Sequence, residues 1–411
     1  MRTLISDWTF HKAGQGLFYS GCIKSHKDNS FWFVFDCGTV QGATELKSQI
    51  KDFKSRLLSS GREEIDLLVI SHFDNDHINQ ISLLLKNLTC KLAVLPYVST
   101  LERLELYFHK VSDDVTEDDD YFQFLSDPTT YLTQRGVQQI IYLDGNDNQD
   151  VIVDLNPLPD PENRGDLQNS SNDIPLDLRI VMTSKHHSAE QHVLTGKNKN
   201  VKVKKAGRAY VGNAWEFTFH QIKRSFSTTE AFKDTLRTTF DIELSSDFPT
   251  AEELQKIMSK AKLRKELKAT FTSYFGDTNP SSIVVLHGPI RARHSAIHQE
   301  GILYEGKTAY TLLTADCDLH DVTSTEGYIK DQLSLVRIFQ VPHHGSKKSW
   351  GILTDTSGLK ETHALINYGT KNSHGHPDQE VLDWIALRSP DWKLENNTEF
   401  VKFSYFINTY I

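Results

Sequence analysis

The segment Ser71–His77 holds a dense group of side chains that could bind metal ions. Its sequence, SHFDNDH, places His72, Asp74, Asp76 and His77 within six residues. Imidazole and carboxylate groups together suit zinc, manganese or iron. A tight loop can direct alternate side chains toward two ions a few ångströms apart, the arrangement that clamps a displacement at phosphorus. The pattern predicts a two-metal site, although the same residues could also be ordinary turn or cap residues.

A short apolar run leads directly into this loop. The run Asp66–Ser71 (DLLVIS) is bounded by polar residues, which is typical of a buried strand. The loop would then follow the carboxyl end of a strand, where open α/β sheets gather their chemistry. The local pattern therefore favours a functional loop over an isolated turn.

Strands and helices alternate on both sides of a central segment. The first part predicts strands at Leu17–Ile23, Phe31–Cys37, Lys91–Pro96 and Gln139–Leu143. It also predicts a helix over about 43–59, with Leu46, Ile50, Phe53 and Leu57 on one face. The last part predicts strands at Ser282–His287, Tyr310–Thr314, Leu335–Val341, Ala364–Tyr368 and Phe400–Ile407, and a helix at Asp378–Leu387.

The alternation stops between residues 144 and 278. Loop-forming residues dominate 144–177, a strand is predicted at Leu178–Met182, and 227–276 shows helical spacing. We predict an insertion over 144–278 that is rich in helix and separates two scaffold halves, 1–143 and 279–411. The insertion contains a lysine stretch, Lys197–Arg208, in which Lys204 and Lys205 could hold a nucleic-acid backbone. The same stretch could instead be a solvated edge strand or loop.

The H-x-D-x-D-H pattern resembles the signature loop of metallo-β-lactamase-fold hydrolases. Because Asp74 stands at the usual second histidine, it is most similar to the hydrolase domain of ComEC-type competence proteins. Further blocks resemble that group in the same order: Gly14–Gly16 (GQG), Phe35–Gly38 (FDCG), Asn279–Val285 (NPSSIVV), Leu312–Asp316 (LLTAD), Val341–Ser346 (VPHHGS) and Asn372–Pro377 (NSHGHP). The resemblance spans 14–377 without the insertion, and it implies an α/β fold, an αβ/βα four-layer sandwich.

The resemblance also implies a site with two divalent metal ions. One ion would be bound by His72, Asp74 and Asp316, and the other by Asp76, His77, Asp316 and His343. Asp76, His344 and His376 are the candidate catalytic residues, and Ser346 is a candidate substrate contact. A water between the ions would lose a proton near neutral pH and attack phosphorus. Mn²⁺ or Zn²⁺ is expected, with Mg²⁺ as a further candidate because carboxylates are numerous.

Some of these residues also have structural interpretations. Asp316 follows an apolar strand and could cap a helix. His376 could hydrogen-bond the turn that Pro377 completes. Asp36 and Asp66 are expected to orient the signature loop rather than to bind metal. Ala315 departs from the glycine that is usual before the bridging aspartate, which restricts the backbone there.

Composition limits the classes of function. The chain has 411 residues, a formal net charge of −9 and 38% hydrophobic residues, which fits a soluble protein with a large core. The negative charge argues against a general positive coat for nucleic acid. No run of eighteen apolar residues and no leader-like N-terminus is present, so no membrane association and a cytoplasmic location are expected. Three of the four cysteines, Cys22, Cys37 and Cys90, are expected to be small buried hydrophobic residues. Cys317, next to Asp316, could be a soft metal ligand if the strand bulges, although strand alternation directs it to the opposite side.

These observations favour a metal-dependent phosphodiesterase, a nuclease that hydrolyses DNA. An alternative keeps the metals and changes the substrate to a small phosphorylated or ester metabolite, such as a cyclic nucleotide. A third interpretation is a non-catalytic interaction module with a vestigial site. Bound metal and the size of the substrate distinguish the three.

Overall fold

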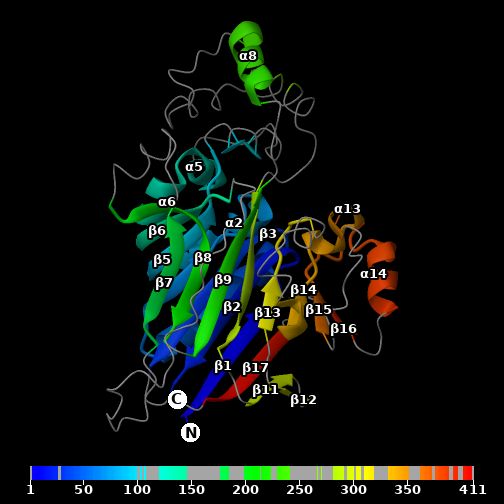
Figure 1. Cartoon of the computed structure of the whole chain (residues 1–411). Coiled ribbons are helices and arrows are strands. Elements are labelled where there is room, and N and C mark those ends of the chain that lie inside the picture. Colours follow the sequence, from blue (N-terminus) through cyan, green and yellow to red (C-terminus); the bar gives the residue numbers. More distant parts are fainter. Residues whose placement is uncertain are drawn as a thin grey trace.

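The computed structural model describes residues 2–25, 29–99, 102–103, 106–107, 120–145, 176–184, 199–212, 214–223, 229–240, 266, 270, 281–290, 294–299, 302–306, 310–318, 332–350, 362–372, 375–387, 392–396 and 401–409. In these residues seventeen strands belong to one hydrogen-bonded sheet. The sheet has two halves, which Figure 1 shows crossing the centre of the molecule.

The first half of the sheet carries the strand before the signature loop. Its strands are β1 (Arg2–Phe10), β2 (Gln15–Lys24), β3 (Ser30–Gln41), β4 (Glu64–Val69), β5 (Thr89–Pro96) and β6 (Val137–Leu143). β1, β2 and β3 pair antiparallel, and β3 to β6 pair parallel in chain order. β1 also pairs with β17 (Val401–Thr409), which is followed by β11 (His294–Gln299) and β12 (Ile302–Gly306).

The second half of the sheet carries the remaining predicted ligands. Its strands are β10 (Ser281–Pro289), β13 (Tyr310–Leu313), β14 (Val336–Gln340), β15 (Thr362–Ile366) and β16 (Trp392–Asn396). β10 and β13 are antiparallel, whereas β13 to β16 run parallel. Parallel strands bring their carboxyl ends to one edge, and that edge is where Asp316 and His343 follow β13 and β14.

Strands within 144–278 join the two halves. They are β7 (Leu178–Ser184), β8 (Val201–Val211) and β9 (Trp215–Lys223). The start of β8 pairs with β6, its end pairs with β7 and β9, and β9 pairs with β10. Among the described residues, β8 pairs only with β6 over Val201–Val203 and with both β7 and β9 over Gly207–Val211, so the edge-strand interpretation of the lysine stretch stays a prediction.

The alternation of β8 explains how a lysine-rich stretch can belong to the sheet. Val201, Val203 and Ala209 are buried, while Lys202 between them is exposed. Of the predicted helical region 227–276, the structure describes α8 (Thr229–Phe240), and most of the remainder lies outside the described residues. The boundaries of the insertion stay a prediction.

Helices cover the outer faces of the two sheet halves. On the first half lie α1 (Ala43–Ser59) and α3 (Ile81–Leu85), with α5 (Asp120–Ser126) and α6 (Pro128–Gln134) packed into the same apolar cluster. On the second half lie α13 (Lys347–Trp350) and α14 (Gln379–Ala386). Figure 1 shows α5 and α6 on one flank and α13 and α14 on the other. α1 buries Leu46, Ile50, Phe53 and Leu57, as its spacing predicts.

A separate core fills the space between the sheet halves. Trp8 of β1 is fully buried there and stacks on Trp215 of β9, with ring centroids 5.3 Å apart. Phe33 and Phe217 pack beside them at 4.8 Å. Truncating an aromatic side chain of this kind costs about 3–5 kcal/mol. The order helix, sheet, sheet, helix confirms the predicted α/β four-layer sandwich.

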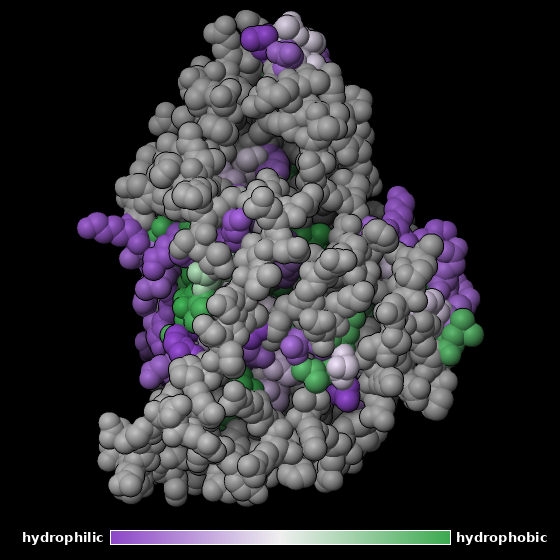
Figure 2. Space-filling model, in the orientation of Figure 1, coloured by the Kyte–Doolittle hydropathy of each residue, from purple (hydrophilic) through white to green (hydrophobic). Residues whose placement is uncertain are grey.

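The outer surface and the cysteines fit this arrangement. Figure 2 shows hydrophilic side chains gathered over the β5–β7 flank and over α14. All four cysteines are free and buried, as predicted for Cys22, Cys37 and Cys90. Within the part of the chain that the structure describes, none of the helices combines the length and apolarity needed to span a bilayer.

Candidate metal centre

The candidate centre forms where loops from both sheet halves meet. β4 ends at Val69 and leads through the signature loop into the short helix α2 (Asn75–Ile78). Asp316 follows β13, and the 3-10 turn His343–Gly345 follows β14. The His343 amide donates to the Ala315 carbonyl at 3.0 Å, which ties these last two loops together.

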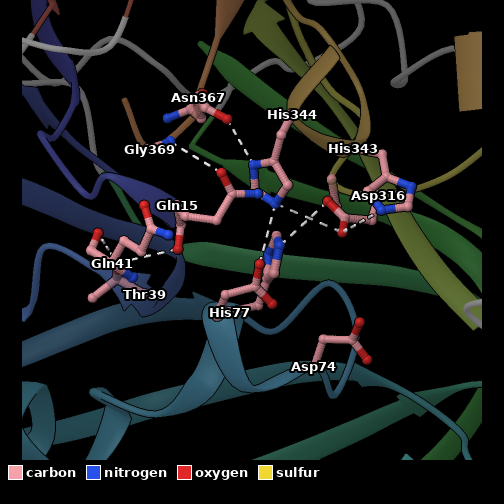
Figure 3. A network of polar contacts seen from close by, with 12 residues as sticks. Gln15, Thr39, Gln41, Asp74, His77, Asp316, His343, His344, Asn367 and Gly369 are labelled. Atoms are coloured by element: carbon pink, nitrogen blue, oxygen red, sulfur yellow. Dashed lines mark hydrogen bonds and ion pairs between the residues drawn. The ribbon is translucent and has the colours of Figure 1, made fainter. Parts of the chain in front are cut away.

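Four imidazoles surround the carboxylate of Asp316. Figure 3 shows three of them, His77, His343 and His344. The His77 Nε2 lies 3.3 Å from Oδ1, and the His72 Nε2 lies 3.7 Å from Oδ2. The Nε2 atoms of His343 and His344 each lie 3.9 Å from Oδ2. The residues predicted to share a site are therefore brought together around the aspartate that was predicted to bridge.

Asp36 fixes the orientation of the two signature-loop histidines. Its Oδ2 accepts a hydrogen bond from the His77 Nδ1 at 2.8 Å. The Ser71 hydroxyl donates to the same oxygen at 2.5 Å, so this hydroxyl can accept from the His72 Nδ1 at 2.9 Å. Both rings are then held at Nδ1, and Nε2 is directed at Asp316. The prediction that Asp36 orients the loop agrees with these contacts.

His343 and His344 have the same arrangement on the other side of the centre. The His344 Nδ1 donates to the backbone carbonyl of Asn367 at 2.6 Å, and a carbonyl can only accept. The His343 Nδ1 lies 2.7 Å from the Ser349 hydroxyl. Each ring is thus held at its outer nitrogen, and its inner nitrogen faces carboxylate oxygens.

The inward-facing atoms lack the partners that a stable core requires. The Nε2 atoms of His72 and His77 and the Oδ1 of Asp316 are buried and make no hydrogen bond. The His344 Nε2 differs, because it donates to the Asp76 Oδ2 at 3.1 Å. A buried unpaired polar atom costs about 1–3 kcal/mol. Bound cations would satisfy all of these atoms at once, so the donor set fits metal ions.

The potential ligands form two groups that share Asp316. One comprises His72, Asp74 and Asp316, and the other comprises Asp76, His77, Asp316 and His344. Within each group the ligand atoms lie within 4.8 Å of one another. The second group differs from the predicted ligand set, which has His343 in place of His344. The His343 side chain is 36% exposed at the rim of the centre, whereas His344 is buried.

Charges in the centre maintain an ionised carboxylate at its middle. Burial raises the pKa of Asp316, but the nearby His77, His343 and His344 hold it well below its usual value. Burial lowers the pKa of His77, but Asp316 and Asp36 outweigh burial and raise it well above its usual value. Burial lowers the pKa of His72 overall, since its neighbour His77 adds to that effect. The centre therefore attracts positive charge strongly.

Two glycines allow the backbone of the signature loop to approach β2 and β3. A Cβ atom on Gly38 would lie 2.6 Å from backbone atoms of Asp76 and His77. A Cβ atom on Gly16 would lie 2.6 Å from the Asp76 carbonyl oxygen. Real Cβ atoms do not approach this closely, so both positions require glycine. This explains physically why the GQG and DCG blocks accompany the loop.

The turn before Asp316 is held in an unusual conformation. Ala315 has a φ of 49°, in the left-handed region that glycine adopts more readily. The Gln340 Oε1 accepts from the amides of Thr314 and Ala315 at 3.0 and 2.9 Å. Alanine at the usual glycine position is thus accommodated because Gln340 stabilises the turn.

Other predicted residues lie at the rim or elsewhere. The His376 Nδ1 lies 3.6 Å from the Asp378 Oδ2, and its ring centroid is 5.9 Å from that of His343. Ser346 is buried at the start of α13. Lys204 lies opposite Leu143 at the carboxyl end of β6, and Lys205 follows it. The catalytic and substrate-binding roles of these residues stay predictions.

Asp66 does not act as predicted. Its carboxylate accepts from Arg62 at 2.9 Å, from Lys91 at 2.6 Å and from the Trp32 amide at 2.8 Å, all outside the signature loop. The residues that orient the ligands and that sequence reasoning missed are Ser71, Gln340, Ser349 and Asn367. Only Ser71 had a signal, its position directly before His72.

Comparisons with known proteins add little to this geometry. No family model matches the chain, and no curated protein matches it. Among solved structures, the crystal structure of a long form RNase Z from yeast is similar with a TM-score of 0.31 and 6% sequence identity. The similarity covers 90% of this chain and 36% of the RNase Z chain, so this chain spans about a third of that length. A TM-score this low carries no conclusion about activity.

Proposed function

We propose that this chain is a metal-dependent phosphodiesterase of the metallo-β-lactamase fold, and that its substrate is DNA. The observation that carries the proposal is the common orientation of His72, His77 and His344. Each is fixed at Nδ1 and turns Nε2 toward Asp316. The four-layer sandwich supports it, because the layers bring both halves of the ligand set to one edge.

The two ligand groups around Asp316 would hold the ions. Divalent Mn²⁺, Zn²⁺ or Mg²⁺ bound there would make a water nucleophilic near neutral pH and neutralise charge on the phosphoryl oxygens. Asp36 and Ser71 keep the rings of His77 and His72 in the tautomer that a ligand needs. The site's own contribution is therefore to hold lone pairs in place before substrate arrives.

Rim residues are assigned to substrate and leaving group. The His376 Nδ1 lies 3.6 Å from the Asp378 Oδ2, and we assign to His376 protonation of the leaving oxygen. Asn372 holds the backbone of His376 from both sides: its Nδ2 donates to the His376 carbonyl at 2.7 Å and its Oδ1 accepts from the His376 amide at 3.0 Å. Such support allows a partly buried group at the rim to keep one orientation.

The substrate alternative is a small phosphoester. The net charge of −9 favours it, since a polymer requires many positive contacts. The lysines of β8 favour DNA, because Lys204 lies at the sheet edge that carries the signature loop. Size of substrate decides between the two.

The decisive experiment is hydrolysis by metal-free protein that is reloaded with Mn²⁺, Zn²⁺ or Mg²⁺. Its substrates are single-stranded DNA, duplex DNA and bis-(p-nitrophenyl) phosphate, and Asp316→Asn is the inactive control. Metal-dependent cleavage of DNA supports the proposal. Cleavage of the small ester alone supports the alternative. Elemental analysis that finds no bound metal, together with no hydrolysis, would leave an interaction module.

The role of the basic strand is tested separately. Affinity for DNA falls as salt rises, and the plot of log affinity against log salt has a negative slope. The double variant Lys204→Ala with Lys205→Ala should make this slope less steep by about two if both lysines contact phosphates. Lys47→Ala with Lys51→Ala, on the exposed face of α1, is the matched control. Equal salt dependence in the two double variants removes β8 from the substrate site.

A further inference from the structure

The turn Gly14–Gly16 lies between the two halves of the candidate centre. β2 begins within this turn, at Gln15. The turn contacts both the signature loop and the loop that follows β15. Figure 3 shows Gln15 between Gln41 and the segment that contains Asn367 and Gly369. None of the roles assigned so far uses the Gln15 side chain.

On one side, the turn supports the backbone of Asp76. Gly16 packs so closely that an added Cβ would lie 2.6 Å from the Asp76 carbonyl oxygen and 2.2 Å from the Gly38 carbonyl oxygen. The position of Asp76 is thus limited by direct backbone contact with this turn. A shift of the turn would shift the carboxylate that faces His344.

On the other side, Gln15 holds the loop that orients His344. The Gln15 side chain is buried, and its Oε1 accepts from the Gly369 amide at 3.0 Å. Gly369 follows Asn367 by two residues, and the Asn367 carbonyl is the acceptor for the His344 Nδ1. The amide that Gln15 holds and the carbonyl that His344 needs therefore belong to the same short turn.

Gln41 reinforces this attachment. Its Nε2 donates to the Lys371 carbonyl at 2.8 Å, and the Thr39 hydroxyl donates to the Gln15 carbonyl at 3.1 Å. A Cβ atom on Gly369 would lie 2.6 Å from the Gln41 Oε1 and 3.0 Å from the Gln15 Cβ. Gly369 is thus enclosed by both glutamines, so the loop has little freedom to move away.

We propose that Gln15 is a positioning residue that sets the separation of Asp76 and His344 and holds the Asn367 carbonyl in place for the His344 Nδ1–H. Gly16 supports Asp76, and Gln15 holds the Asn367–Gly369 turn whose carbonyl accepts from the His344 Nδ1. The proposal rests on the proposed function and deepens it, since Asp76 and His344 belong to the second ligand group. The hydrogen-bond network on which it stands is independent of any ion.

The test compares three glutamine variants. Gln15→Met keeps the length of the side chain and removes the accepting oxygen, whereas Gln15→Glu keeps an accepting oxygen. Gln49→Met is the matched control, because Gln49 bonds the buried ring of His11 at 3.2 Å, away from the centre. It removes a glutamine hydrogen bond to a histidine without touching the Asn367–Gly369 turn.

The first readout is the Nδ1–H proton of His344 in metal-free protein, from its ¹H chemical shift and its exchange with solvent, with the signal assigned by its loss in His344→Gln. We expect a slowly exchanging Nδ1–H in the wild type, in Gln15→Glu and in Gln49→Met, and faster exchange in Gln15→Met because the Asn367 carbonyl is no longer held in place. Unchanged exchange in Gln15→Met overturns the proposal. Because no ion is present, this result does not depend on the proposed function.

The second readout is metal affinity by competition with a chelating dye. Loss of a group that orients a metal ligand lowers affinity by about 10–100-fold. We expect that loss for one ion in Gln15→Met and none in Gln49→Met. Equal losses in both variants would show a general effect on stability and overturn the positioning role. If Gln15→Met does not fold, Gln41→Met removes the more exposed bond to Lys371 and should give a smaller change in the same two readouts, while no change would again overturn the role.

Discussion

Two fully buried histidines in this protein, His77 and His287, have opposite surroundings. His287 of β10 lies in the core between the sheet halves, where its Nε2 contacts the Tyr19 hydroxyl at 3.0 Å and its Nδ1 accepts from the Trp215 indole at 3.3 Å. His77 bonds Asp36 with one nitrogen and presents the other, without a hydrogen bond, to Asp316. Burial is the same in both, and the partners differ.

The difference separates a structural histidine from a ligand. Burial lowers the pKa of His287 to about 3, so the ring stays neutral with both nitrogens satisfied. Carboxylates overcome burial at His77 and raise its pKa, so its surroundings favour a positive charge. The neutral core histidine has both nitrogens satisfied, whereas the inward Nε2 of His77 lies against Asp316, where a proton or a metal cation would satisfy it.

The largest test of this contrast is Asp316→Asn. The variant keeps the shape of the side chain but removes the charge that both ligand groups share, so we expect hydrolysis to fall by about 10³-fold or more, or about 4 kcal/mol in the activation free energy. Activity on bis-(p-nitrophenyl) phosphate and bound metal by elemental analysis measure the effect. Retention of both ions would contradict a bridging role.

Removal of metal by a chelator should destabilise the protein. Ions present at 1,000 times their dissociation constant contribute about 4 kcal/mol to the free energy of unfolding. Urea denaturation with and without chelator measures this difference. His287→Gln is the control and should show the same difference as the wild type, because His287 binds no ion. A wild type unaffected by chelation contradicts the metal site.

The pH dependence of the free energy of unfolding tests the other histidine of the comparison, His287. Between about pH 6.5 and 3 the unfolded chain protonates His287 and the folded chain does not, so its contribution is present above pH 6.5 and is lost as pH falls. The loss between pH 7 and pH 4.5 is about 2.7 kcal/mol, the value of two pKa units. His287→Gln cannot take up a proton and should lack this part of the acid destabilisation. Urea denaturation at both pH values compares the two proteins, and parallel losses would refute the assignment.

The smallest effect is expected from Asp36→Asn. The amide orients His77 less strongly than the carboxylate, so metal affinity should fall by about 10–100-fold while the protein stays folded. Asp66→Asn is the matched control, since it breaks the contacts to Arg62 and Lys91 and should reduce stability without changing metal affinity. A chelator competition titration compares the two. Equal affinities in both variants would show that Asp36 is only structural.

Much of the fold was predictable because its patterns are local. The helix at residues 43–59 has the predicted bounds and the predicted buried face. The strand before the signature loop was recognisable from its apolar run. β9 was not predicted, although Trp215, Phe217 and Phe219 alternate with polar residues and are all buried. In β8 the lysines obscure the same alternation of buried and exposed side chains.

The site was predictable in its residue types and less so in its geometry. His72, Asp74, Asp76, His77 and Asp316 were identified by spacing and resemblance, and they lie together. Neither the burial of His344 nor the exposure of His343 follows from their order in the sequence. Both have a positive φ, 55° and 46°, so this turn does not follow the regular alternation of a strand.

The sequence by itself determined the layers and the chemical character of this protein, because periodicity and ligand type are properties of short segments. Only the tertiary structure decided which nitrogen of each histidine faces inward. The partner of the His344 Nδ1 is a carbonyl that lies 23 residues away along the chain, and the Asp76 carboxylate that faces its Nε2 lies 268 residues away. Such distant partners meet only after both sheet halves have packed, and no local pattern encodes their distance or direction.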